Sequence, residues 1–276
     1  MLAIGEDASG NKKIEAYPKE DVPEKLLEDK HFSEINMASG QLKGFKITES
    51  WGVEQLWQIN LALKPGQRIS KVRSMHQTAS ESEHSKHLYL PTTFNGDNLV
   101  YKFLDTNLLA VSVETNDALE LFIIDSISGR IVYTFHEDRV VVDEPYDMLL
   151  RENYFVLAFK RASHLTGLPQ QELTVTEFYK NEEEKDTWKI LKEKYLFGGE
   201  KTDQTQFNSA ELETPFVVQE SYMLPIDVKR IEMTNSQQHL TSKMLVLITS
   251  NDQVYSIENA LFSARRQSKE QAEAKA

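Results

Sequence analysis

Residues 101–135 read YKFLDTNLLAVSVETNDALELFIIDSISGRIVYTF, and they give the clearest indication of the fold. Its three apolar runs, Leu108–Val113, Leu119–Ile124 and Ile131–Phe135, are separated by two short polar turns rich in Asn, Asp, Ser and Gly. Apolar runs of this length with hairpin-length connections are typical of consecutive antiparallel strands. The stretch therefore predicts a β-meander, and nothing in it indicates a catalytic centre.

A second hairpin shows the same turn chemistry. Ile35–Gly40 (INMASG) matches Ile124–Gly129 (IDSISG), and a looser copy surrounds residues 250–252. The glycine suits a positive φ, and Asn36 or Asp125 can accept hydrogen bonds from the turn backbone. The first two copies lie about 90 residues apart, roughly twice the ~40–45 residues of one propeller blade. The repeat favours a propeller, and a β-sandwich whose hairpins share turn chemistry is the alternative.

The rest of the chain gives a coarser reading. Met1–Tyr17 predicts a hairpin, and Gln55–Leu61 predicts a strand that follows the hairpin around residues 38–40. Phe178–Gln206, which is rich in charged residues, predicts a long excursion from the sheets. From Ser256 onward the sequence predicts a helix.

Composition excludes several classes of protein. The formal net charge of −12 argues against nucleic acid as a partner, because binding to phosphates needs clustered Lys and Arg. The chain contains no cysteine, so disulfides, Cys-ligated zinc and thiol catalysis are excluded. No apolar run reaches the ~18–20 residues that span a bilayer.

Residues with possible chemistry all have a simpler structural explanation. His84 and His87, with Glu81 and Glu83 beside them, have a spacing that a metal site could use, but the stretch is polar and loop-like and the sequence does not place a third ligand. Asp125, Asp143 and Asp147 lie in or beside turns, where aspartate bonds to the backbone. Phosphate-binding glycine loops and a nucleophile elbow are absent from the sequence. We therefore predict no catalytic, cofactor-binding or metal-binding residues, and no enzymatic activity.

Four segments resemble one known family when they are taken in order. The run from Tyr101 is followed by 218–225 (VQESYMLP), 240–246 (LTSKMLV) and 259–266 (NALFSARR). Their order and spacing resemble the C-terminal part of the subunit 1 family of the endoplasmic-reticulum membrane protein complex. The residues that carry the family motifs are Asn107, Asp125, Gly129, Arg130, Gln219, Tyr222, Pro225, Arg265 and Arg266.

The resemblance implies an all-β fold, a partial β-propeller of quinoprotein-like (WD/PQQ-like) type with antiparallel meander blades and a few short helices. It implies blades over residues 1–266 and a polar tail over 267–276. It also implies a non-catalytic scaffold on the luminal side of the endoplasmic reticulum without a cofactor. Its partners would be the other subunits of the complex and, indirectly, tail-anchored and multipass clients, with membrane contact only through segments outside this chain.

The sequence departs from the family pattern near its end. Ala264 stands where the family has proline, and the chain ends where the family continues to a membrane span. We expect a fragment that forms an arc of blades with exposed edges. Two alternatives remain open: a quinoprotein-like dehydrogenase that holds a quinone and calcium, and a soluble, cytoplasmic propeller that binds peptides.

Overall fold

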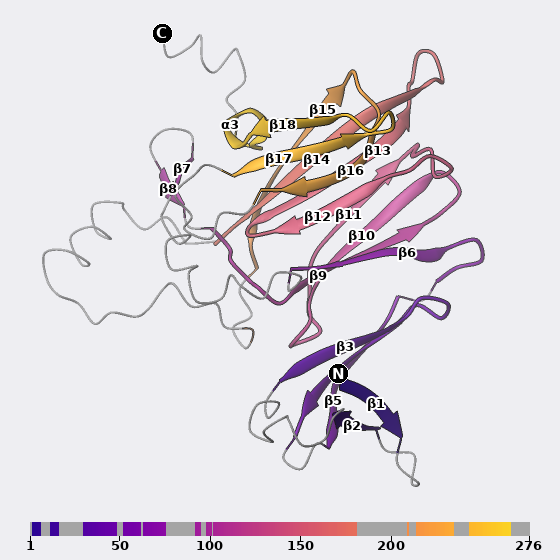
Figure 1. Cartoon of the computed structure of the whole chain (residues 1–276), viewed down its shortest axis with the longest axis vertical. Helices are drawn as coiled ribbons and strands as arrows, with labels where there is room; N and C mark the ends of the chain where they lie inside the picture. The colour runs from indigo at the N-terminus through magenta and orange to yellow at the C-terminus, as the bar shows by residue number, and fades with distance from the viewer. Residues whose placement is uncertain are drawn as a thin grey trace, which may run out of the picture.

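The part of the chain that the structure describes is built almost entirely of antiparallel β-structure. The computed structural model describes residues 2–6, 12–16, 30–48, 52–61, 63–75, 92–94, 98–100, 102–180, 209, 214–234 and 243–265. The described strands form four sheets of three or four strands, which we number in chain order, and two separate hairpins (Figure 1).

The meander predicted from residues 101–135 forms most of the second sheet. Its strands are β9 (Leu108–Glu114), β10 (Ala118–Asp125) and β11 (Ile131–Asp138), and the order across the sheet is β11-β10-β9-β6. The prediction of three consecutive antiparallel strands is confirmed. Strand β6 (Arg68–Ser74) completes this sheet by pairing with β9, and the sequence reading did not identify it.

The third sheet also has four strands in chain order. They are β12 (Asp147–Arg151), β13 (Tyr154–Ala162), β14 (Pro169–Tyr179) and β15 (Phe216–Leu224). Strand β14 is buried from Gln171 to Tyr179, so the excursion predicted to begin at Phe178 was placed too early. The apolar side chains of Phe178 and Tyr179 pack inside the domain, and this packing extends the strand to Tyr179.

The first and fourth sheets have three strands each. The first contains β3 (His31–Asn36), β4 (Gln41–Ile47) and β5 (Val53–Asn60); the fourth contains β16 (Val228–Met233), β17 (Met244–Thr249) and β18 (Val254–Glu258). The separate hairpins are β1 (Leu2–Glu6) with β2 (Lys12–Ala16), as predicted, and β7 (Thr92–Phe94) with β8 (Asn98–Val100).

A short helix follows the last strand. Helix α3 covers Asn259–Phe262, whereas the sequence predicted helix from Ser256. Residues 256–258 instead continue β18, because they pair with Met244–Val246 of β17.

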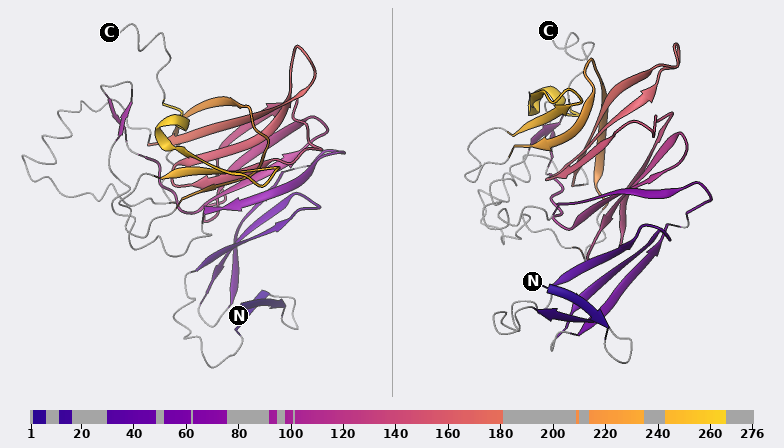
Figure 2. Two further views of the ribbon diagram at one scale, coloured as in Figure 1. Left: turned by 45° about the horizontal axis from the view of Figure 1, so that its top comes forward. Right: turned by 45° about the vertical axis from the view of Figure 1, so that its right-hand side comes forward.

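Successive sheets are connected in one repeated way. The outer strand of one sheet leads into the first strand of the next, from β5 to β6, from β11 to β12 and from β15 to β16. Strand β12 contacts both β6 and β16, so the first strands of the second, third and fourth sheets lie side by side while the later strands fan outward (Figure 2). Blades of a β-propeller are arranged in this way.

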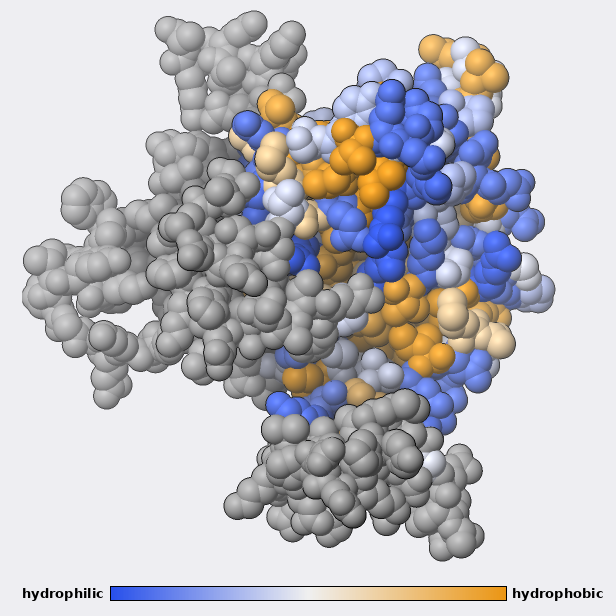
Figure 3. All heavy atoms as spheres, viewed as in Figure 1, coloured by the Kyte–Doolittle hydropathy of each residue, from blue (hydrophilic) through white to orange (hydrophobic). Residues whose placement is uncertain are grey.

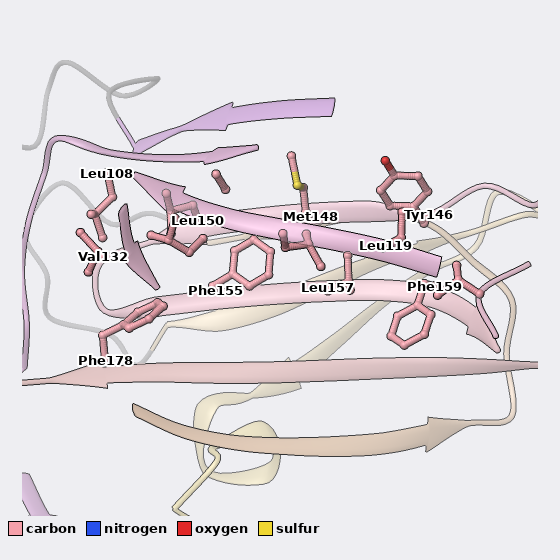
Figure 4. Close-up of a cluster of buried hydrophobic side chains, with 14 of the residues drawn as sticks. Leu108, Leu119, Val132, Tyr146, Met148, Leu150, Phe155, Leu157, Phe159 and Phe178 are labelled. Carbon is pink, nitrogen blue, oxygen red and sulfur yellow. The ribbon is translucent and has the colours of Figure 1, made fainter. Parts of the chain in front are cut away.

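Each pair of neighbouring sheets encloses a hydrophobic core. Leu42 and Val111 lie between the first two sheets, and Leu247 packs in the core between the last two. The largest core among the described residues lies between the second and third sheets (Figure 4). The partly buried Phe135 packs against this core and meets Phe155 edge-to-face at 5.1 Å between ring centroids. Burying one such side chain stabilises the fold by ~1.5–3 kcal/mol, so stacking of the sheets is a main source of stability.

The two repeated hairpin turns have matching geometry. Asn36 Oδ1 accepts a hydrogen bond from the Ser39 N–H at 3.1 Å, and Asp125 Oδ1 accepts one from Ile127 at 2.9 Å. Gly40 and Gly129 have φ values of +70° and +74°. The predicted turn chemistry is therefore confirmed.

The spacing of these turns does not correspond to two blades. The hairpins belong to neighbouring sheets, because residues 75–107 separate β6 from β9 inside the second sheet. That insertion lengthens the sequence interval between the two turns. The interval of about 90 residues therefore matches the length of two blades although the turns lie in adjacent sheets.

Candidate functional site

The most concentrated polar site surrounds the buried carboxylate of Glu177. This side chain is fully buried in β14, next to the segment that follows α3. It accepts hydrogen bonds from Ser263 Oγ at 2.7 Å and from the Ala264 N–H at 2.6 Å. Arg265 Nε donates to the other carboxylate oxygen at 3.1 Å. One carboxylate thus fixes three consecutive residues onto the third sheet.

Helix α3 and strand β15 position the segment Ser263–Arg265 beside Glu177. Phe262 of α3 is buried in the core between the third and fourth sheets, which places Ser263 at the end of β14. Tyr222 in β15 adds a hydrogen bond from its hydroxyl to the Ser263 carbonyl at 2.9 Å. We call Glu177, Tyr179, Tyr222 and the segment Ser263–Arg265 the Glu177 cluster.

The electrostatics of the Glu177 cluster favour a fixed ion pair. The hydroxyl of Tyr179 donates to Glu177, and burial together with that carboxylate raises the pKa of Tyr179. Burial opposes the charge on Arg265, but Tyr179 and Glu177 outweigh it, so the pKa of the guanidinium is raised. Tyr179 and Arg265 therefore keep their protons, and the cluster has a structural role: it holds the segment Ser263–Arg265 on the third sheet.

A second polar group forms at the turn between β10 and β11. Asp125 caps the turn, and its carbonyl accepts the Gly129 N–H at 2.8 Å. The Ser126 N–H bonds to the carbonyl of Asn107 at 2.9 Å. Trp57 reaches across from β5 and donates its indole N–H to the Ser126 carbonyl at 3.1 Å. The turn therefore links the first sheet to the second.

Asp105 is an unusual buried acid beside this turn. Its side chain is fully buried, and Oδ1 accepts the Asn107 N–H at 2.8 Å. Oδ2 has no hydrogen-bond partner among the described residues. Burial is the largest cause that raises the pKa of Asp105 to about 7, and the charge of Asp125 adds to it.

We expect Asp105→Asn to stabilise the protein increasingly as pH rises. The folded-state pKa of about 7 lies above the ordinary value of 3.8. Stability contributed by Asp105 is therefore complete below pH 3.8 and is lost as pH rises to about 7. Each pKa unit corresponds to ~1.4 kcal/mol, so the advantage of the variant should grow by a few kcal/mol between about pH 5 and pH 8. Thermal unfolding at both pH values measures it; an equal difference at both would contradict the assignment.

Buried ion pairs join neighbouring sheets at two other places. Asp147 of β12 accepts a hydrogen bond from Arg73 of β6 at 3.0 Å and one from the Ile231 N–H of β16 at 3.0 Å. Arg161 of β13 pairs with Glu137 of β11. The sequence reading placed Asp147 in or beside a turn, but it begins β12 and connects three sheets.

The structure brings most of the family-motif residues into the two polar groups. Asn107, Asp125, Gly129 and Arg130 lie together at the β10–β11 turn, and Tyr222 and Arg265 meet in the Glu177 cluster. Gln219 instead lies near Glu137, with a long contact of 3.4 Å.

Pro225 and Arg266 belong to neither group. Pro225 lines a cavity of about 390 Å³ between the β15–β16 and β17–β18 turns. Arg266 lies outside the described residues, as do His84 and His87.

Sequence reasoning missed Glu177, Asp105 and the inter-sheet pairs. Each of these acids stands in or beside a strand, where the local sequence gives no sign of its distant partner. Among the described residues no group of three or more His, Asp or Glu could hold a metal ion. No helix of the described part is long and apolar enough to cross a membrane.

Comparison with known proteins agrees with this architecture. A family model described as "ER membrane protein complex subunit 1, second beta-propeller" matches residues 2–276. Proteins called ER membrane protein complex subunit 1 from Xenopus laevis and Gallus gallus are 24% and 27% identical over 266 residues, which is 92% of this chain and 24% of each relative. The relative from Schizosaccharomyces pombe is 22% identical over 88% of the chain and 25% of its own length.

The fold and its polar groups define a β-propeller domain whose stacked sheets are joined by buried hydrogen bonds and ion pairs. The chain belongs to the ER membrane protein complex subunit 1 family, within the region described as its second β-propeller. The predicted all-β propeller class and the resemblance to this family are therefore confirmed. The chain spans about a quarter of the length of the curated relatives that it matches.

Proposed function

We propose that this chain is a non-catalytic scaffold domain of an ER membrane protein complex, on the luminal side. Support comes from the family match over residues 2–276 and from relatives named as subunit 1 of that complex. In this role the domain contacts other subunits, and through them it supports insertion of tail-anchored and multipass proteins. We also propose that residues 1–266 act as one unit.

The observation that supports this proposal most directly is that buried carboxylates connect neighbouring sheets rigidly. Glu177 and Asp147 are buried carboxylates, and each bonds to groups from distant parts of the chain. Removing one partner of such a buried pair is strongly destabilising, so these contacts hold the sheets in one arrangement. A scaffold needs this property because its partners dock on surfaces that several blades form together.

The test is purification of the longer protein that contains this chain, tagged and extracted in mild detergent. We expect the other subunits of the complex to co-purify in stable proportion. Recovery of the folded protein without any of them would overturn the proposal. A second arm measures insertion of a tail-anchored client after depletion and rescue; rescue without assembly would separate insertion from the scaffold role.

A further inference from the structure

We propose that the free edge of β18 accepts an extended segment of the same polypeptide from outside residues 1–276, which adds a fourth strand to the fourth sheet. The second and third sheets have four strands each, whereas the fourth has three with β18 at its outer edge. The inference concerns strand pairing and does not depend on the proposed scaffold function.

β18 is far more exposed than the third strands of the second and third sheets. Those strands, β10 and β14, each have a fourth strand beside them and are largely buried, whereas β5, the outer third strand of the first sheet, is largely exposed as β18 is. In β18 every residue except the half-buried Ile257 is exposed, and Val254 reaches 66%. The strand occupies an interior position without the neighbour that covers its counterparts.

The backbone of β18 also offers unpaired hydrogen-bonding groups. The register pairs Tyr255 with Leu247 and Ser256 with Val246, and the turn begins with a bond from the Thr249 N–H to the Gln253 carbonyl. Because bonded and non-bonded pairs alternate in antiparallel sheets, Tyr255 and Ile257 bond to β17. The N–H and C=O groups of Val254, Ser256 and Glu258 point to the free edge, and no described residue pairs with them there.

The residues that follow β18 are directed away from this edge. The chain enters α3 at Asn259, and the Glu177 cluster then holds Ser263–Arg265 against the third sheet. A hairpin from β18 straight into a fourth strand is therefore excluded, and the missing strand has to come from elsewhere.

The face beside this edge indicates the chemistry of the incoming segment. The half-buried Met244, Val246 and Ile248 alternate with the buried residues of β17. The exposed Val254, which pairs with Ile248, extends this apolar strip onto β18. Figure 3 shows this strip as a hydrophobic patch over β17 and β18. An added strand would place apolar residues beside Val254 and Tyr255, and a basic residue beside Glu258.

Two observations favour the same polypeptide as its source. The vertebrate relatives are about four times as long as this chain, because the match covers 92% of this chain but only 24% of each relative. In the described part, the outer strand of each of the first three sheets leads into the first strand of the next. The incoming strand should therefore continue into a blade that covers Met244, Val246 and Ile248.

The experiment compares Ser256→Pro with Ser256→Ala in the longer protein. Proline removes the N–H that faces the edge and obstructs a neighbouring strand, while the pairing with β17 does not use that N–H. Alanine keeps the N–H and serves as the matched control. Hydrogen exchange is measured at Val254, with the β17-bonded Tyr255 as internal reference, and a photo-cross-linker at Val254 identifies the neighbour by mass spectrometry.

We expect the Val254 N–H to exchange within about tenfold of the Tyr255 N–H in the Ser256→Ala protein. The cross-link should map to the same polypeptide outside residues 1–276. In Ser256→Pro the cross-link should be lost and Val254 should exchange at least about 100-fold faster, while Tyr255 keeps its protection. Rapid exchange at Val254 in the alanine control would overturn the proposal, and so would cross-links confined to another protein or to residues 1–276.

Discussion

Replacing Glu177 by alanine should lower the free energy of unfolding by about 3–5 kcal/mol, the range for breaking a buried ion pair by removing one partner. The variant leaves the guanidinium of Arg265, whose side chain is 20% exposed, without its carboxylate. It also leaves Ser263 Oγ and the Ala264 N–H without an acceptor. Urea unfolding followed by circular dichroism measures the change.

The matched control for Glu177→Ala is Glu232→Ala. Glu232 pairs with Arg230, but both side chains are about half exposed, at 47% and 59%. Exposed pairs contribute ~0–1 kcal/mol, so this variant should unfold almost like the parent chain. Glu177→Gln should fall between the two, because it keeps the size and one acceptor. Similar losses in Glu177→Ala and Glu232→Ala would show that the Glu177 cluster does not hold the segment after α3.

Replacing Gly129 by valine should cost about 3–5 kcal/mol, as the sum of two separate penalties. The residue has a φ of +74°, which a β-branched side chain adopts only with strain. A Cβ at this position would also lie 2.6 Å from Cγ of Trp57. The turn alone predicts only ~1–3 kcal/mol, and the approach of Trp57 from the first sheet raises the expected loss.

Gly167→Val separates the two penalties. Gly167 has a similar φ of +68°, but no atom lies within 4 Å of an added Cβ. Its substitution should therefore show the backbone strain alone, about 1–3 kcal/mol. Trp57→Leu combined with Gly129→Val should recover part of the difference. Equal thermal shifts for Gly129→Val and Gly167→Val would mean that Trp57 does not press on the turn.

Much of the local structure of this protein could be predicted from its amino-acid sequence. Three apolar runs with short polar turns specify β9, β10 and β11, because alternation and turn chemistry act over a few residues. The same reasoning predicted the β3–β4 hairpin from the turn that begins at Asn36. It also predicted the β17–β18 hairpin from the turn at residues 250–252. The order of the four motif segments also indicated the family, and the match of the family model over residues 2–276 confirms it.

Which polar residues form buried pairs, and how many sheets the described strands build, depends on tertiary contacts that no local pattern reveals. Glu177 and Arg265 are 88 residues apart, and Asp147 and Arg73 are 74 apart. Neither pair has a local signal, since a buried charge is tolerated only where a distant partner meets it. Strand β6 was missed for the same reason. Its sequence, RISKVRS, carries three basic residues, and pairing with β9 rather than its own pattern makes it a strand.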